Sequence, residues 1–317
     1  MLRLVGELLS PAGERARLGI LSYHRALSAL DPLLHDEIDG ATFEAHMRLL
    51  AAEFNVIPLA EACERLARGK LPARAACVTF DDGYADNERV ALPILKQLGL
   101  PATFFVCTGY SGGGIMFNDA VIEALRHAPA GTHDLSGLGL GILELSDSVT
   151  RRAAVDAIIG KLKYRPVEER KAVVERIALT LQVALPRNLM LTPAQIRRLH
   201  DEGMEIGAHT VNHPILAQLG DDEAHAEIAG SKRTLEEITG ARVTLFAYPN
   251  GKPGRDYGPQ HVRLVREVGF AAAVSTIAGV AHRGSDLFQL PRFSPWDRNP
   301  LRLGVRLLAS CARPGAA

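Results

Sequence analysis

The sequence alternates apolar strand patterns with helix patterns, and this order constrains the fold more than any other feature. Six apolar segments have the length and composition of buried strands: 18–23, 75–80, 102–107, 204–208, 243–247 and 271–274. Helix patterns lie between them, such as 42–53, with Thr42 as its expected N-cap, and 87–98. This alternation is typical of an α/β fold with a parallel sheet. The strand-then-helix units are numerous enough for a barrel.

Residues 111–191 depart from that rhythm. They contain a glycine-rich stretch at 137–141 and two charged helix patterns at 149–163 and 167–181. Loops are the parts of a scaffold that best tolerate inserted segments. We therefore predict a single barrel domain over residues 1–317, with a helical insertion at about 111–191 on one of its loops.

Composition excludes several classes of protein. The 36 basic and 36 acidic side chains give a formal net charge of zero, which argues against nucleic acid as a partner. No apolar run approaches the roughly 18 residues of a membrane-spanning helix. Residues 1–19 hold an apolar patch interrupted by Glu7, which favours a short amphipathic helix over a signal peptide. The four cysteines form no C-x-x-C pair. We interpret them as buried free thiols and predict a cytoplasmic location.

The first chemical cluster is T-F-D-D-G-Y at residues 79–84, directly after a buried strand. The adjacent carboxylates of Asp81 and Asp82 would repel each other in a low-dielectric setting if both stayed ionised. A cation that binds one of them leaves the other free to act as a base. The alternative is a plain turn, since Asp-Asp-Gly is good turn chemistry.

The second cluster is H-T-V-N-H-P at residues 209–214, after another strand pattern. The i, i+4 spacing predicts that His209 and His213 share one face of a helical turn, which Pro214 keeps short. Two histidines and a carboxylate pair at the rim of one barrel indicate a two-His, one-Asp metal site with open positions. These donors suit Zn²⁺, and also Co²⁺, Ni²⁺ or Fe²⁺.

Two further segments each have two interpretations. The strand end at 246–254 contains Pro249 and Gly251, and could present N–H groups to an oxyanion or form an ordinary turn. Residues 109–113 match G-x-S-x-G, the nucleophile elbow of serine hydrolases, around Ser111. Because further glycines follow where the elbow needs a helix, we favour a loop there.

The first two clusters together resemble the polysaccharide deacetylase family, whose motifs are T-F-D-D-G and H-[ST]-x-x-H. The resemblance extends from residue 20 to about residue 292. It implies a distorted (β/α) barrel with seven or so parallel strands and hydrolytic, metal-dependent removal of acetyl groups from a glycan, usually N-acetyl groups of amino sugars. It also implies a role for each matching residue: Asp82, His209 and His213 as metal ligands, Asp81 as the base that deprotonates the metal-bound water, and Tyr248, Pro249 and Asn250 as the oxyanion-holding segment.

The chain departs from the family's usual third and last motifs. It has A-Y-P-N at residues 247–250 in place of R-x-P-Y, and L-P-R-F at 290–293 in place of the late L-x-H. Our hypothesis is that Arg292 reaches Asp81 from another strand and that His24 is the general acid. A core histidine is the alternative for His24. A branch of the family associated with exopolysaccharide biosynthesis, with F-x-Y-P-x-G as its third motif, is similar to this arrangement.

Substrate contacts and the C-terminal segment leave more alternatives open. Tyr84 and Trp296 could stack on a sugar or belong to the core, and Asn118 and Asp119 could face the site or cap a helix. The same metal site could act on a non-sugar amide or a cyclic imide, or the chain could be a catalytically silent glycan-binding module. The C-terminal segment is expected to be a surface helix packed on the barrel, with peripheral contact to an anionic membrane as the second interpretation. Its arginines are Arg298, Arg302, Arg306 and Arg313.

Overall fold

The computed structural model describes residues 2–312, which form two compact units. The described residues of the first unit are 2–29, 37–111 and 191–312, and the second unit comprises 30–36 and 112–190. The sequence interpretation placed an insertion at about 111–191 and did not include 30–36. This short segment belongs to the second unit although it lies far from the rest of it in the sequence.

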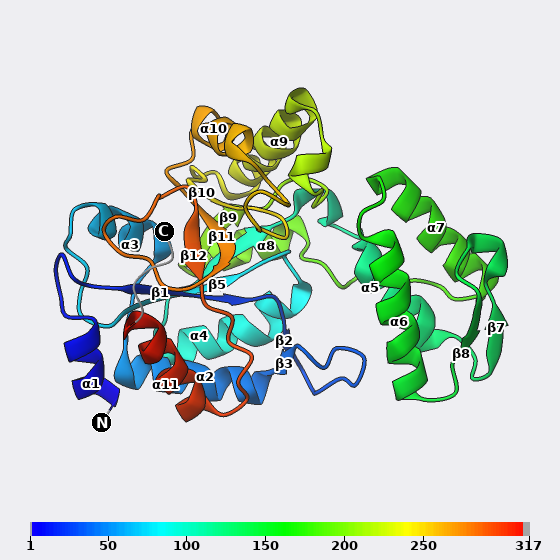
Figure 1. Ribbon diagram of the computed structural model, residues 1–317, viewed down its shortest axis with the longest axis horizontal. Coiled ribbons are helices and arrows are strands. Elements are labelled where there is room, and N and C mark those ends of the chain that lie inside the picture. Colours follow the sequence, from blue (N-terminus) through cyan, green and yellow to red (C-terminus); the bar gives the residue numbers. More distant parts are fainter. Residues whose placement is uncertain (1, 313–317) are drawn as a thin grey trace. The chain divides into compact units, whose positions relative to one another are not determined.

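The first unit is built on a nearly closed parallel sheet, which confirms the predicted α/β barrel-like fold (Figure 1). All of its strand pairs are parallel. The strands lie in the order β1 (Leu18–Tyr23), β5 (Ala75–Phe80), β6 (Thr103–Val106), β9 (Glu205–Ala208), β10 (Leu245–Ala247), β11 (Ala272–Ala278) and β12 (Leu290–Arg292), and β4 (Asn55–Val56) adds to β5. The N–H of Phe293 donates to Ile20 O at 2.7 Å, and the N–H of Ser22 donates to Phe293 O at 3.0 Å. The end of β12 is thereby joined to β1.

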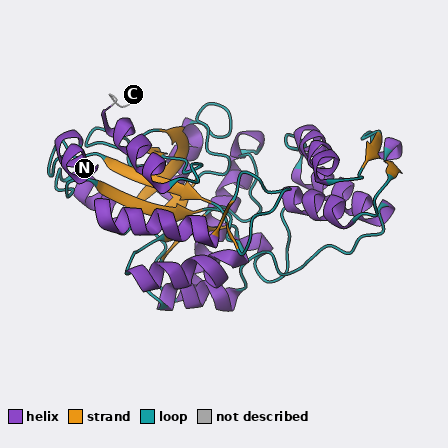
Figure 2. Ribbon diagram, turned by 90° about the horizontal axis from the view of Figure 1, so that it is seen from below, coloured by secondary structure: helices purple, strands orange, loops and turns teal. Residues whose placement is uncertain are grey.

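Helices surround this sheet (Figure 2). They are α1 (Leu2–Leu9), α2 (Gly40–Glu53), α3 (Leu59–Ala67), α4 (Leu92–Leu98), α8 (Pro193–Asp201), α9 (Asp221–Thr239), α10 (Pro259–Glu267) and α11 (Pro300–Ala312). Alternate residues of a strand face opposite sides of the sheet. Val78 and Phe80 accordingly pack with α2 residues outside the barrel, and Cys77 packs with Ile20 and Phe105 in its interior.

Two expectations about local structure in this unit are corrected. The N-cap of α2 is Asp39, whose side chain accepts a hydrogen bond from the N–H of Thr42 at 2.9 Å, so Thr42 is inside the helix. The segment expected as one helix over 87–98 begins with a π-helical turn, η1 (Asn87–Ala91), before α4. The Asn87 side chain donates to His24 O at 2.9 Å, which ties this turn to the end of β1.

The second unit has its own apolar core. Its helices are α5 (Phe117–His127), α6 (Ser148–Leu162) and α7 (Val167–Thr180), and its strands β7 (Thr132–Asp134) and β8 (Ile142–Glu144) form an antiparallel hairpin around the glycine-rich stretch. Leu125, Ile158 and Ile177 are among the fully buried side chains of this core. The two charged helix patterns of the sequence correspond to α6 and α7.

The C-terminal segment forms α11, which packs on the first unit through Leu303, Leu307 and Leu308. Leu301 and Val305 are exposed, and Arg313 lies outside the described residues. Contact with a membrane stays a prediction. None of the helices described here is long and apolar enough to cross one.

Candidate metal centre

The acidic pair is placed where β5 ends and the chain turns sharply. Asp82 has φ 73°, a left-handed conformation that non-glycine residues seldom adopt, and Gly83 follows with φ 85°. The N–H of Gly83 donates to Asp81 O at 2.9 Å. The carboxylate of Asp81 contacts Arg292 and that of Asp82 contacts two histidines, so the adjacent acidic groups have separate partners.

Asp81 forms a bidentate ion pair with Arg292. Nη1 donates to Oδ1 at 2.7 Å and Nη2 to Oδ2 at 2.6 Å, and Arg292 Nε donates to Ser275 O at 2.8 Å. Both side chains are almost completely buried. Burial by itself would raise the pKa of Asp81, but the Arg292 charge holds that pKa below its usual value. The contact that we expected between these residues is therefore present, and the role of Asp81 as a base stays a prediction.

Asp82 faces both histidines of the second cluster. Its Oδ1 lies 3.4 Å from His209 Nε2 and 3.5 Å from His213 Nε2. This oxygen is buried and has no hydrogen-bond partner among the described residues. Burial would raise the pKa of Asp82, and the two histidines beside it hold the pKa well below its usual range. A buried, ionised oxygen without a hydrogen bond, aimed at two imidazole nitrogens, fits a divalent cation.

Each histidine presents its Nε2 atom to Asp82. His209 Nδ1 lies 2.7 Å from Ala247 O, and because a carbonyl only accepts, Nδ1 donates this hydrogen bond and leaves Nε2 as the nitrogen that faces Asp82. Burial lowers the pKa of His213 to about 4, so the neutral imidazole predominates at neutral pH.

The loop that carries these histidines is not the helical turn we expected. Thr210 and His213 have φ 66° and φ 51°, so the chain is left-handed at two positions. Glu227 of α9 provides the physical reason. Its carboxylate accepts hydrogen bonds from the N–H groups of Val211 and Asn212, both at 2.8 Å, and from Asn212 Nδ2 at 2.7 Å. These strong, charge-assisted bonds hold the loop in a non-helical conformation. Sequence reasoning missed Glu227.

The segment after β6 holds the same loop from another side. The N–H of Gly109 donates to Val211 O at 2.8 Å, and Tyr110 Oη donates to Asn212 O at 2.9 Å. A Cβ at Gly109 would lie 2.8 Å from Val211 O, so the close approach requires glycine. The Ser111 hydroxyl donates to Leu191 O at 3.0 Å, and a turn rather than a helix follows it. Ser111 therefore lacks the strand-to-helix setting of a nucleophile elbow.

Cys107 joins the cluster and was not singled out as a ligand from the sequence. The ligand atoms of Asp82, Cys107 and His209 lie within 4.8 Å of one another and form a candidate metal site. Cys107 Sγ donates to His209 O at 3.1 Å, and burial raises the pKa of the thiol well above its usual value. In this protonated form Cys107 supports the backbone of His209. All four cysteines are free and buried, as predicted.

His24 follows β1 and is exposed. Desolvation by surrounding atoms opposes its protonation, but the negative charges of Asp82, Glu37 and Asp81 outweigh this effect and raise the pKa of His24. An imidazole that keeps its proton near neutral pH suits a general acid. That role stays a prediction.

The segment at residues 248–250, expected to hold an oxyanion, offers fewer backbone N–H donors than expected. Tyr248 is fully buried, its ring stacks on Tyr257 with centroids 3.8 Å apart, and its N–H donates to Val274 O at 3.2 Å. Pro249 has no N–H to offer. Asn250, with φ 58°, is therefore the remaining donor of this segment.

The residues predicted on the substrate side differ in accessibility. Tyr84 is buried, with the Arg25 guanidinium 4.7 Å from the centre of its ring, so it offers no open face to a sugar. Trp296, by contrast, is 67% exposed. Asn118 and Asp119 lie in the first turn of α5 in the second unit, after the N-cap residue Met116, and neither is the cap.

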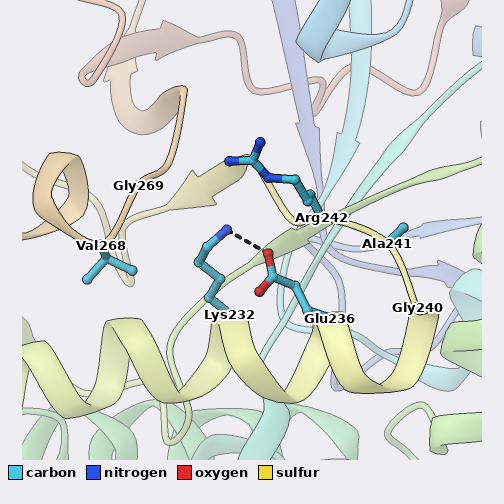
Figure 3. A pocket seen from close by; sticks show the side chains of 7 residues that line it. All are labelled: Lys232, Glu236, Gly240, Ala241, Arg242, Val268 and Gly269. Atoms are coloured by element: carbon cyan, nitrogen blue, oxygen red, sulfur yellow. Dashed lines mark hydrogen bonds and ion pairs between the residues drawn. The ribbon is translucent and has the colours of Figure 1, made fainter.

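A surface pocket elsewhere in the first unit does not contribute to the site (Figure 3). Its lining includes Arg242, just before β10, and Gly269, just before β11, so it lies at the amino ends of the strands. The acidic pair and the histidines lie at the carboxyl ends. The charged group of Lys232 in this pocket is paired with Glu236 at 2.8 Å.

Comparison with known proteins identifies the family. Residues 68–273, well over half of the chain, match the family described as "Polysaccharide deacetylase". The chain belongs to the polysaccharide deacetylase family. It is similar to the "Putative polysaccharide deacetylase YxkH" of Bacillus subtilis (strain 168), with 23% identity over 279 residues, which cover 87% of this chain and 71% of the relative.

Two solved structures share the fold. The Streptococcus pyogenes deacetylase PplD, in complex with acetate, has a TM-score of 0.62 and 20% identity, with 94% of this chain and 99% of that chain covered. IcaB from Ammonifex degensii has a TM-score of 0.60 and 20% identity, with 96% and 99% covered. At this level of identity the two structures support the polysaccharide deacetylase fold of this chain.

Proposed function

We propose that this chain is a metal-dependent hydrolase that removes acetyl groups, chiefly N-acetyl groups of amino sugars, from a poly- or oligosaccharide. One observation carries the proposal. Asp82 Oδ1 is buried, accepts no hydrogen bond from residues 2–312, and faces His209 Nε2 and His213 Nε2, next to an Asp81 carboxylate fixed by Arg292. A glycan-binding module without activity has no need of this arrangement.

Asp82, His209 and His213 would hold the cation, and Zn²⁺ fits these donors, as do Co²⁺, Ni²⁺ and Fe²⁺. A bound divalent ion supplies Lewis-acid polarisation of the acetyl carbonyl and lowers the pKa of water. The Cys107 thiol, hydrogen-bonded to His209 O, keeps its proton and serves as a support for His209 rather than as the third ligand.

Asp81 accepts the proton of the attacking water. Its carboxylate is ionised and fixed in direction because both of its oxygens are bonded to Arg292. The arginine comes from β12, a strand far from β5 in the sequence, and takes the place of the missing arginine of the third motif. The N–H of Asn250 is the backbone donor of the β10 loop available to the developing oxyanion.

His24 donates the second proton. When the C–N bond of the acetamide breaks, the leaving amine must gain a proton to depart as a neutral amine. The raised pKa of His24 keeps a proton on this exposed side chain. The proton gained by Asp81 and the proton lost by His24 balance over one turnover, which gives acetate and a free amino sugar.

Names of relatives support the substrate class. YxkH carries a polysaccharide deacetylase name, and PplD is described with acetate, the product expected here. The F-x-Y-P-x-G motif at 246–251 further suggests the branch of the family associated with exopolysaccharide biosynthesis.

Acetate release tests the proposal. The metal-reconstituted protein is assayed on N-acetylglucosamine oligomers, acetylated exopolysaccharides and O-acetyl xylan. We expect acetate from the N-acetylated substrates, loss of the activity in Asp81→Asn, and retention in the matched surface variant Asp201→Asn. No release from any glycan, together with cleavage of a small amide or cyclic imide, would overturn the carbohydrate assignment.

A further inference from the structure

Trp296 is the only tryptophan of the chain and is 67% exposed, although indole is the largest side chain a protein can bury. It lies four residues after Arg292, the partner of Asp81. None of the steps assigned to the metal centre uses it. Its exposure therefore calls for a separate explanation.

The indole ring is held in place from one side. The Arg306 guanidinium lies 3.8 Å from the ring centre and is itself fixed, since Arg306 Nε donates to Asp297 Oδ2 at 2.6 Å. The carbonyl of Asp297 in turn accepts a hydrogen bond from the buried His46 at 2.6 Å. One face of the ring is thus covered by a cation, and with 67% of the residue exposed the opposite face is open to solvent. The open face is preorganised because little side-chain freedom remains to be lost on binding.

Trp296 follows β12 on the side of the barrel where the strands have their carboxyl ends. Phe293 is hydrogen-bonded to β1 at Ile20 and Ser22, so the segment leaves β12 at the rim that also carries Asp81. Four residues of extended chain span at most about 14 Å, so the backbone of Trp296 is within that distance of Arg292. A glycan bound with one acetamide at Asp81 extends over such distances.

We propose that the open face of Trp296 is a glycan-binding subsite that stacks on a pyranose ring several units from the one being deacetylated. A pyranose presents a face of C–H groups, which packs well on the electron-rich face of an indole. This inference rests on the proposed function for the substrate class. It adds that the enzyme selects chains over single acetylated sugars.

Because Trp296 is the sole tryptophan, its fluorescence reports on this subsite directly. The titration uses His24→Ala, which truncates an exposed side chain and blocks turnover in the proposed function, and N-acetylglucosamine oligomers of increasing length. We expect a saturable change in emission that strengthens with chain length. Binding of the long oligomers seen by calorimetry without any change in tryptophan emission would overturn the subsite.

Kinetics with matched variants provide the second measurement. For a long oligomer, Trp296→Ala should raise KM by about five- to tenfold, since truncating an aromatic anchor costs more than about 1 kcal/mol. The effect should shrink for the disaccharide, and Trp296→Phe should recover most of the affinity. Leu301→Ala, which truncates an exposed apolar side chain of α11, is the control and should match the wild type.

Two outcomes separate this inference from the proposed function. Equal KM values for Trp296→Ala and wild type on long oligomers would contradict the inference while leaving the proposed function standing. Absence of deacetylation in the wild type would remove the proposed function, and the fluorescence titration would still test the subsite.

Discussion

Two carboxylates on neighbouring residues can share a buried site because each has a different counter-charge. Arg292 neutralises Asp81 through two hydrogen bonds, and the orphaned Oδ1 of Asp82 is directed at the histidines. The left-handed backbone at Asp82 separates the two side chains. The charge of the pair is therefore divided between a fixed arginine and a cation site, which makes Arg292 the residue on which the ionisation of Asp81 depends.

Replacement of Arg292 by Gln should damage both stability and turnover. Removing one partner of a buried ion pair leaves an unpaired charge and costs about 3–5 kcal/mol. We expect a loss of that size in urea unfolding and acetate release at or below the detection limit. Arg292→Lys should recover little, because an ammonium cannot form the two-pronged contact. The exposed Arg283, paired with Glu14, gives the control Arg283→Gln, which should change stability by less than about 0.5 kcal/mol. A similar loss in both variants would refute the special role of Arg292.

The third metal ligand can be decided by comparing His213→Gln with Cys107→Ser. Both residues lie near Asp82, but His213 is a neutral imidazole facing Oδ1, whereas the Cys107 thiol is protonated and bonded to His209 O. We expect His213→Gln to weaken metal affinity, measured by competition with a chelator, by at least about tenfold more than Cys107→Ser, whose hydroxyl can keep the hydrogen bond. The reverse order would assign the ligand to Cys107.

The site residues that the sequence predicts are those carried by local motifs. Asp82, His209 and the contact of Arg292 with Asp81 follow from what stands at the ends of strands. Cys107 was not predicted as a candidate ligand, because in the sequence it belongs to an apolar strand pattern and resembles an ordinary core residue. Glu227 was not predicted as a site residue, because it lies about fifteen residues after the loop that carries His209 and His213. Its contact with that loop forms only when α9 packs against β9.

Helix α9 determines, through Glu227, the conformation of the loop at residues 209–213 that carries both histidines. Glu227→Gln replaces one carboxylate oxygen with an NH₂ group that cannot accept the N–H of Val211 or Asn212. We expect metal affinity to fall by about 10- to 100-fold, as for other residues that orient ligands. The readout is metal titration together with unfolding of the metal-free protein. Glu237→Gln, an exposed position of the same helix, is the control. A drop in metal-free stability without any change in affinity would show that Glu227 is structural only.

The contact of α2 with β1 and with the segment before α11 predicts a dependence of stability on pH. His46 is fully buried, with Tyr23 Oη 3.1 Å from Nδ1 and Asp297 O 2.6 Å from Nε2, and burial lowers the pKa of His46. The unfolded chain therefore binds more protons below about pH 6.5, and the free energy of unfolding falls as the pH decreases through that range. Titration of this residue contributes at most about 1.4 kcal/mol per pH unit.

His46→Gln should flatten that dependence in urea unfolding between pH 5 and 7, while His225→Gln, at an exposed position of α9, should keep the wild-type slope. Equal slopes in all three proteins would contradict the assignment.

Strand and helix patterns predicted the elements of the barrel well because both faces of its strands are buried, as in β5, where all six residues are buried. Sequence patterns did not predict the structural details that depend on which side chains are in contact. Thr42 looked like the N-cap of α2, and only the folded chain shows that Asp39 accepts the hydrogen bond. Residues 30–36 join the second unit without a sequence signal, because membership in a unit is decided by tertiary contacts.

For the whole molecule, metal binding should be coupled to folding, since Asp82 follows β5, His209 and His213 follow β9, and the two loops converge only in the native state. A ligand that binds the folded state alone stabilises it by about 2.7 kcal/mol at 100 times its Kd. For a protein of 317 residues that corresponds to a rise in Tm of about 4 °C on addition of Zn²⁺. We expect Asp82→Asn to lose the rise and Asp201→Asn to keep it.

Chelation should lower Tm and abolish acetate release together. Ser111→Ala should leave both intact, because the Ser111 hydroxyl is bonded to Leu191 O and takes no part in the proposed reaction. Activity that survives complete removal of metal and disappears in Ser111→Ala would replace the metal mechanism with a serine one. Loss of activity on chelation without a change in Tm would instead place the metal on the substrate, because an ion bound between the loops after β5 and β9 must contribute to the stability of the fold.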